Sequence, residues 1–291
     1  MTSRAVIHSD VVVLAETDWR HSAREHEARA REWTRPHLER RRRGISHPVM
    51  DFLFDYYPYS PGRLHAWHPG IGFALAGDWR PASSAAAYQL IDGAWHADPE
   101  AVDRHRLQLA IGILTGTQQR DAHFGCFGMH EWAMVYRSNP EAIRHSNQQL
   151  RMDIEDISDV VDDVGLRCTH IDAFRFFTAS AVPLNEHRPT RENQPRIEQG
   201  GCIHANMDLF KYSMWFQPYV PGDLVLDCFA LAVRAREIDM RASPYDLTEL
   251  GYEPIAVESP EGRRRYVDEQ RRLSAEAKPL RQRLLGFLHT L

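Results

Sequence analysis

The fold class is indicated most clearly by residues 150–164, which read Leu-Arg-Met-Asp-Ile-Glu-Asp-Ile-Ser-Asp-Val-Val-Asp-Asp-Val. Apolar side chains recur there at Leu150, Ile154, Ile157, Val161 and Val164, with spacings of 4, 3, 4 and 3 residues. This period places them on one face of an α-helix, and the acidic side chains fall on the opposite face. The stretch therefore predicts an amphipathic helix whose acidic face lies in solvent.

The helical period recurs in other parts of the chain. Residues 107–114 and 223–237 each carry apolar side chains on one side. A last helix is predicted from Glu261 onward, with a kink or break at Pro279. These segments cover much of the chain and favour a mainly helical protein.

One segment has the pattern of a β-hairpin. Residues 88–96 carry Asp92-Gly93 at their centre, a pair that suits the tight turn between two antiparallel strands. Together with the helical segments, it predicts a mainly α fold, a single large helical domain with a small β-hairpin element.

Charge dominates the N-terminal part. Residues 19–43 hold nine arginines against four glutamates, a local net charge of +5, and predict an exposed helix interrupted near Pro36. Four of the arginines are consecutive, at Arg40, Arg41, Arg42 and Arg43. We expect three parts: a charged N-terminal helical extension, a mainly helical core that carries the site, and a C-terminal helix that packs on the core or on a second subunit. They span residues 1–45, 46–260 and 261–291.

Composition excludes several classes of protein. The 291 residues are 43% hydrophobic and 26% charged, which is typical of a globular chain and argues against a disordered or fibrous one. The net charge is 35 minus 40, or −5, so no overall basic field draws the chain to nucleic acid. No apolar run approaches the roughly 18 residues of a membrane-spanning helix. Four cysteines are too few for a disulfide scaffold, so we expect a cytoplasmic protein with reduced thiols and no membrane partner.

Cysteine, histidine and carboxylate side chains concentrate in three short segments. These are His123–Trp132, Cys168–Asp172 and Cys202–Asp208. The last two share a Cys-x-His pattern that is followed within four residues by aspartate, and chance rarely produces this twice within 41 residues. We interpret the three segments as the functional centre.

Two kinds of chemistry remain open for these residues. A carboxylate in an aromatic pocket can act as the general acid or base that activates water, and the candidates are Glu131, Asp172 and Asp208. The alternative is a non-haem iron centre, because imidazole and carboxylate ligands suit iron. Its ligands would be His130, Glu131, His170, Asp172, His204 and Asp208. Zinc-finger and zinc-deaminase patterns do not fit, because no two cysteines lie closer than 26 residues.

Six segments spread over nearly the whole chain carry a further signal. They are His47–Tyr57, Trp67–Gly70, Gly125–Arg137, Arg167–Thr178, Cys202–Asp208 and Asp239–Leu247. Together they resemble a family of actinobacterial proteins that carry the label 3-methyladenine DNA glycosylase. The resemblance implies a DNA-repair hydrolase that extrudes an alkylated purine from the duplex and directs water to the sugar carbon with a carboxylate. The consecutive arginines would then hold DNA phosphates, and no cofactor would be needed.

Aromatic and polar side chains near the motifs would bind the extruded base, because a cationic alkylated base is attracted to ring faces. The substrate-binding candidates are Tyr57, Trp67, His130, Trp132, His170, His204, Asn206 and Arg241. Three functions are therefore carried forward: a DNA glycosylase-like hydrolase, a metal-dependent oxidoreductase acting on a small molecule, and a non-catalytic binding module. A homodimer is compatible with each.

Overall fold

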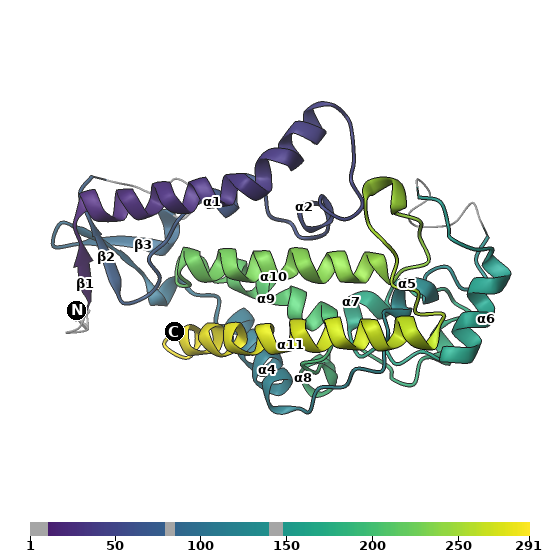
Figure 1. Cartoon of the computed structure of the whole chain (residues 1–291). Coiled ribbons are helices and arrows are strands. Elements are labelled where there is room, and N and C mark those ends of the chain that lie inside the picture. The colour runs from purple at the N-terminus through teal and green to yellow at the C-terminus, as the bar shows by residue number, and fades with distance from the viewer. Residues whose placement is uncertain (1–10, 79–84, 140–147) are drawn as a thin grey trace.

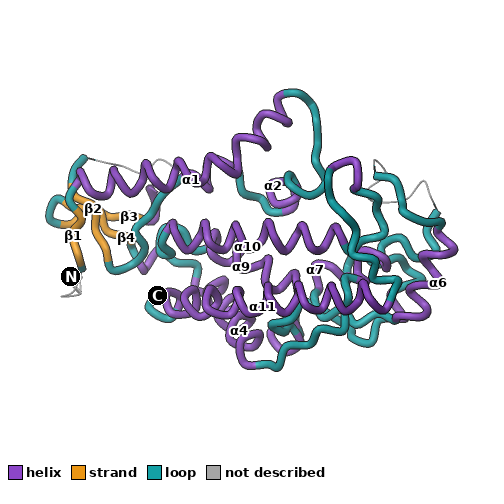
Figure 2. The backbone as a smooth tube through the Cα atoms, viewed as in Figure 1, coloured by secondary structure: helices purple, strands orange, loops and turns teal. Residues whose placement is uncertain are grey.

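The computed structural model describes residues 11–78, 85–139 and 148–291. Helices make up most of these ranges, and the strands gather at one end (Figures 1 and 2). Within the described residues there are eleven α-helices and one four-stranded sheet, which confirms the predicted mainly α fold with a small β element. None of the helices in these ranges is long and apolar enough to cross a membrane.

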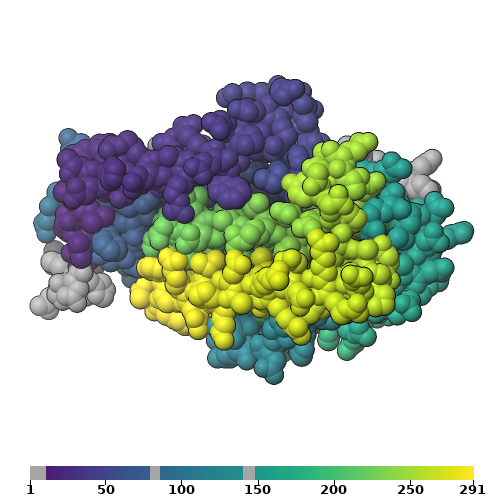
Figure 3. Space-filling view, in the orientation of Figure 1, coloured from purple at the N-terminus to yellow at the C-terminus, as the bar shows by residue number. Residues whose placement is uncertain are grey.

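Two adjacent helices, α9 (Ile203–Trp215) and α10 (Gly222–Arg241), form the centre of the fold. Eleven of the thirteen residues of α9 are buried, so other elements surround this helix on all sides. Figure 3 shows α10 as a green band between the N-terminal helix and the C-terminal helix. Polar side chains on α9 must therefore find partners inside the protein, because an unpaired buried polar group is costly.

Long helices cover this pair. The N-terminal helix α1 (Glu16–Arg42) contacts α10 and the short α3 (Pro61–His65). The C-terminal helix α11 (Pro260–Leu288) packs on α9, on α10 and on α4 (Arg104–Gln119), which in turn contacts α8 (Gln194–Ile197).

Both long helices continue through a proline. Neither the interruption expected at Pro36 nor a break at Pro279 occurs, since α1 and α11 remain helical on either side. A proline removes one helical hydrogen bond and costs about 3 kcal/mol. Buried residues next to each proline, Thr34 and His37 in α1 and Ala277 in α11, hold the helix in place and offset that cost.

The predicted boundaries of three helices change. Helix α6 (Ile154–Val164) begins after Asp153, because Leu150 instead forms a β-bridge with Tyr245. The helix expected at 107–114 is the middle of α4, and α10 continues to Arg241, four residues beyond the predicted end. The last of these differences matters for the site.

The sheet has strand order β1-β2-β4-β3. Its strands are β1 (Val12–Leu14), β2 (Phe73–Ala76), β3 (Tyr88–Ile91) and β4 (Ala94–Ala97). The predicted hairpin is β3 and β4, and Asp92 and Gly93 both have positive φ, as the expected turn requires. The sheet lies at one end of the molecule, whereas the short helices α5 (Met129–Ala133) and α7 (Ile171–Phe174) lie towards the other (Figure 1). The helix α2 (Phe52–Tyr56) packs on α10 between them.

Candidate functional site

The three predicted segments meet at one place, where the ring of His204 contacts those of His130 and His170. His130 comes from α5, His204 from the first turn of α9, and His170 stands directly before α7. The ring of His204 lies 4.5 Å from that of His130 and 5.3 Å from that of His170, measured between centroids. All three side chains are buried. His204 therefore stands between two groups of polar residues.

Two glycines let the chain bring these segments together. Gly128 enters α5 with a φ of 72°, and an added Cβ would lie 3.3 Å from the ring of Tyr266. Gly201 precedes α9 so closely against the carbonyl oxygen of His123 that a Cβ there would clash. Gln270 of α11 then donates a hydrogen bond to the carbonyl oxygen of Gly201 at 2.6 Å. Residues without a side chain are thus needed where the loops meet, which positions His130 and His204.

We name the residues His130, His204 and Asp239 the first cluster. Each offers one ligand atom, and these three atoms lie within 4.8 Å of one another. The Nε2 of His130 donates a hydrogen bond to Oδ1 of Asp239 at 2.7 Å. Arg236 donates to Oδ2 of Asp239 at 3.0 Å and to Oε1 of Glu131 at 3.0 Å. The other oxygen of Glu131, Oε2, is buried and finds no hydrogen-bond partner among the described residues.

The second cluster comprises His170, Asp172, Asp208, Glu198 and Lys211. In it, Nε2 of His170 lies 3.3 Å from Oδ2 of Asp208 and 3.3 Å from Oε1 of Glu198. The ligand atoms of His170, Asp172 and Asp208 also lie within 4.8 Å of one another. The ammonium of Lys211 forms an ion pair with Asp208 and lies 3.7 Å from Oδ2 of Asp172. In this cluster a cation of the protein itself already contacts the carboxylates.

Neighbours outside the second cluster complete its hydrogen bonds. Tyr57 donates its hydroxyl proton to Oδ1 of Asp208 at 2.7 Å. Arg191 holds Asp172 with two guanidinium nitrogens, and Arg175 approaches the same carboxylate at 3.3 Å. All three carboxylates predicted to be catalytic therefore face a fixed cation, because Asp172 and Asp208 contact Arg191 and Lys211, and Glu131 accepts a hydrogen bond from Arg236.

The electrostatic environment gives the three histidines different pKa values. Burial, with the charge of the neighbouring His130, lowers the pKa of His204 to about 3. Burial also acts against a charge on His130, but the carboxylate of Asp239 outweighs it and raises the pKa of His130 above its ordinary value. For His170 the carboxylates of Glu198 and Asp208 raise the pKa in the same way. A neutral imidazole thus lies between two imidazoles that favour the protonated form.

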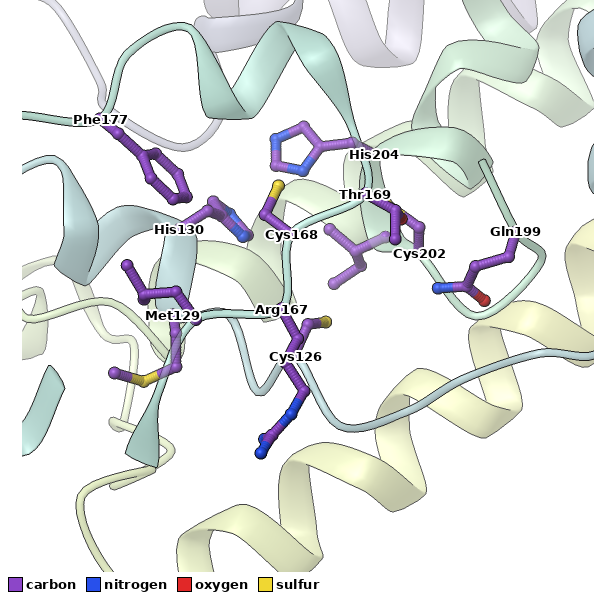
Figure 4. A pocket seen from close by; sticks show the side chains of 12 residues that line it. Cys126, Met129, His130, Arg167, Cys168, Thr169, Phe177, Gln199, Cys202 and His204 are labelled. Carbon is purple, nitrogen blue, oxygen red and sulfur yellow. The ribbon is translucent and has the colours of Figure 1, made fainter. Parts of the chain in front are cut away.

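A small pocket reaches the histidines from one side. Its wall includes His130, His204 and three thiols, those of Cys126, Cys168 and Cys202. Figure 4 shows the imidazoles of His130 and His204 pointing towards the sulfur of Cys168. The pocket offers about 20 Å³ to molecules the size of water, which is enough for one of them. Burial raises the pKa of the Cys168 thiol to about 12, so the thiol is protonated at neutral pH.

No protein family, curated protein or solved structure matches this chain. The resemblance to the glycosylase-labelled family stays a prediction. The geometry of the two clusters is therefore the basis for a function.

Four predicted substrate-binding residues have partners elsewhere in the fold. Trp132 is fully buried and donates its indole proton to the carbonyl oxygen of Ala242 at 2.8 Å. Asn206 accepts a hydrogen bond from Arg281, on the opposite side of α9 from His204 and Asp208. The remaining two are Trp67, which packs on the start of α10, and Arg241, which donates to the carbonyl oxygen of Glu253.

The sequence prediction missed Asp239, Arg236, Glu198 and Lys211. Asp239 had a usable signal, because Leu231 and Ala235 lie on the buried face of α10 and one further turn places residue 239 on that face. Arg236 stands three residues before Asp239, a spacing at which two side chains on a helix meet. Glu198 lies beyond the short helix α8 in a segment without periodicity, where only the tertiary fold places it.

The unfolding free energy of the metal-free protein is expected to be highest near pH 6.5. His204 has a folded pKa of about 3 against an ordinary value of 6.5. Below pH 6.5 the unfolded chain binds a proton that the folded chain does not, so stability falls by up to about 1.4 kcal/mol per pH unit. His130 and His170 have raised pKa values. Their stabilisation of the folded protein is fully present below pH 6.5 and is lost as the pH rises through their folded pKa values.

Urea unfolding with a chelator, from about pH 4.5 to about pH 8.5, measures this profile. The substitution His204→Gln should reduce the slope of the acid side, to which His68, whose pKa burial also lowers to about 3, still contributes, and it should leave the alkaline side in place. A stability that is constant between about pH 5 and about pH 6.5 in the wild type would show that His204 is protonated in the folded state.

Proposed function

We propose that the first cluster of this protein binds one divalent transition-metal ion, with iron(II) as the preferred ion. With this ion bound, the protein would act as a metal-dependent oxidoreductase on a small molecule. The observation that carries the proposal is the buried set of His130, His204 and Asp239, whose ligand atoms lie within 4.8 Å of one another. Two imidazoles and one carboxylate leave open coordination positions on iron, which is the ligand set of non-haem iron oxygenases.

The donor atoms fit such an ion. Bonds from a divalent metal to imidazole nitrogen and carboxylate oxygen are about 2.1 Å long, so ligands at right angles lie about 3 Å apart and opposite ligands about 4 Å. The atoms of His130, His204 and Asp239 need only small shifts to reach these separations. Asp239 is oriented by Arg236, which holds its second oxygen. A hydrogen bond to a ligating carboxylate is common around metal sites and fixes its direction.

The first cluster is enclosed by a buried arginine on one side and opens to a small pocket on the other. Arg236 is fully buried, lies 3.8 Å from the ring of Phe52, and holds Glu131 together with Asp239. The pocket opens on His130 and His204, and the rest of its wall combines thiols and apolar side chains with the polar side chains of Arg167, Thr169 and Gln199. Its size favours a substrate of few atoms or the end of a larger one.

Metal analysis of the purified protein tests the proposal. The protein is stripped with a chelator, reloaded anaerobically with iron(II), dialysed and measured by elemental analysis. We expect one iron(II) ion per chain. A second sample is loaded with cobalt(II) instead, and its absorption spectrum should disappear when excess iron(II) displaces the cobalt. A chain that retains no divalent ion after dialysis at micromolar free metal would refute the proposed function.

A second candidate function is base release from alkylated DNA. The resemblance to the glycosylase-labelled family implies it, and the exposed side chains of Arg41, Arg42 and Arg43 at the end of α1 favour it. The fourth arginine, Arg40, is engaged with Asp51. The geometry supports this function less well, because a purine is much larger than the pocket and the candidate carboxylates face fixed cations. Incubation of the protein with alkylated duplex DNA and measurement of free base would test it.

A further inference from the structure

We infer that the ammonium group of Lys211 occupies the position of a second metal ion in the second cluster. The two clusters together therefore hold only one metal ion, in the first cluster. The inference rests on the proposed function, because it concerns the number of ions that the same site takes. It concerns two clusters with similar donor atoms that differ in the position of their fixed cation. The ammonium of Lys211 lies between two carboxylates of the second cluster, whereas Arg236 holds only the second oxygen of Asp239 in the first.

The second cluster has the donors of a metal site. The ligand atoms of His170, Asp172 and Asp208 lie within 4.8 Å of one another, as do those of the first cluster, and all three side chains are buried. Glu198 adds a third carboxylate, 3.3 Å from Nε2 of His170. Histidine and carboxylate ligands from neighbouring helices are the usual set of a two-metal centre in helical proteins.

Lys211 stands where the ion would be held. Its ammonium contacts Oδ2 of Asp208 and lies 3.7 Å from Oδ2 of Asp172, which places it between two of the three ligands. The side chain is only 13% exposed and lies against the rings of Tyr212 and Trp215, at 4.8 and 5.9 Å from their centroids. A divalent ion bound to the same oxygens would meet a positive charge at close range in a buried site, where repulsion is strong.

The choice of lysine supports this role. The chain has 35 basic residues, and only Lys211 and Lys278 among them are lysines. An ammonium group is a compact point charge, whereas a guanidinium is a planar fork that spreads its charge and its donors. A compact cation can occupy a position of the size of a metal ion between two carboxylates. Arg175 and Arg191, in contrast, reach Asp172 from the surface, where each is at least half exposed.

A second ion would lie next to the first. The ring of His204, a ligand of the first cluster, lies 5.3 Å from the ring of His170 in the second. Ions in two-metal sites are about 3.5–4 Å apart and act together on one substrate. Lys211 therefore sets the class of chemistry, because a single ion with open positions works on its substrate without a second metal.

Metal stoichiometry tests the inference. The experiment compares the wild-type chain with Lys211→Ala and with the matched surface variant Lys278→Ala. Each protein is stripped of metal, titrated anaerobically with manganese(II) or iron(II), dialysed and analysed for bound metal. We expect one ion per chain in the wild type and in Lys278→Ala, and two in Lys211→Ala. The double variant Lys211→Ala with His170→Ala should return to one, which places the extra ion in the second cluster.

The outcomes separate the two proposals. A wild type that binds no ion refutes the proposed function itself. If the wild type and Lys211→Ala each bind one ion, the proposed function stands but the inference about Lys211 is wrong. A wild type that binds two ions also contradicts the inference. If Lys211→Ala does not fold by circular dichroism, Lys211→Met preserves the apolar stem, and its stoichiometry decides in the same way.

Discussion

Replacement of Asp239 with asparagine is expected to lower the affinity for iron(II) or cobalt(II) at least about 100-fold. Asp239 is the only carboxylate of the first cluster, and its side chain is fully buried. Asparagine has nearly the same shape but lacks the negative charge that balances a divalent ion. The remaining imidazoles of His130 and His204 would then have to hold the ion next to the guanidinium of Arg236. Equilibrium dialysis of the stripped protein against graded free metal measures the change.

A matched acidic substitution controls for charge alone. Asp159 lies on the exposed face of α6, so Asp159→Asn should leave metal affinity unchanged. Circular dichroism and thermal unfolding show whether Asp239→Asn keeps the fold. Wild-type affinity in a folded Asp239→Asn variant would mean that the first cluster is not the metal site.

The histidines of the site could be predicted from sequence because their neighbours mark them. The repeated Cys-x-His pattern and the segment around His130 singled out three stretches, and the fold brings them into contact. The pattern could not show how the polar atoms pair. His130 and Glu131 are adjacent in sequence, yet His130 bonds Asp239 whereas Glu131 is held through Arg236.

The carboxylate of the first cluster was missed for a local reason. The predicted helix ends at Glu237, although Ile238 and Ala242 continue the apolar spacing of Leu231 and Ala235. Asp239 therefore falls outside the predicted helix. In the structure α10 continues to Arg241, and its last turn is buried against α5 and α11. A charged residue on the buried face of a helix breaks the pattern that defines the face. This is how the prediction misses the carboxylate of the proposed metal site.

Burial of α9 on every face is a property of the whole fold that sequence spacing does not show. Asn206 of α9 and Trp132 of α5 hydrogen-bond to Arg281 and Ala242 in the structure, and their role in substrate binding stays a prediction. Sequence spacing puts residues 204 and 208 on one face of α9 and residue 206 on another. It does not say which face meets the site when every face is buried.

Replacement of Arg236 with methionine is expected to lower the free energy of unfolding by about 3–5 kcal/mol in the metal-free protein. The guanidinium is fully buried and is shared by two buried carboxylates, those of Glu131 and Asp239, at 3.0 Å each. Methionine fills much of the same space but leaves both carboxylates without their fixed cation. Urea unfolding at neutral pH in the presence of a chelator measures the loss.

A second substitution shows where that loss comes from. If it arises from the uncompensated carboxylates, then adding Glu131→Gln to Arg236→Met should recover roughly 1–3 kcal/mol, because one buried charge is removed. The exposed arginine Arg272, whose partner is Glu269, provides the control, and Arg272→Met should cost less than about 0.5 kcal/mol. A loss below about 1 kcal/mol for Arg236→Met would show that the two carboxylates take up protons or water when the arginine is gone. In that event Arg236 would not be the residue that fixes the direction of the Asp239 carboxylate towards the proposed metal ion.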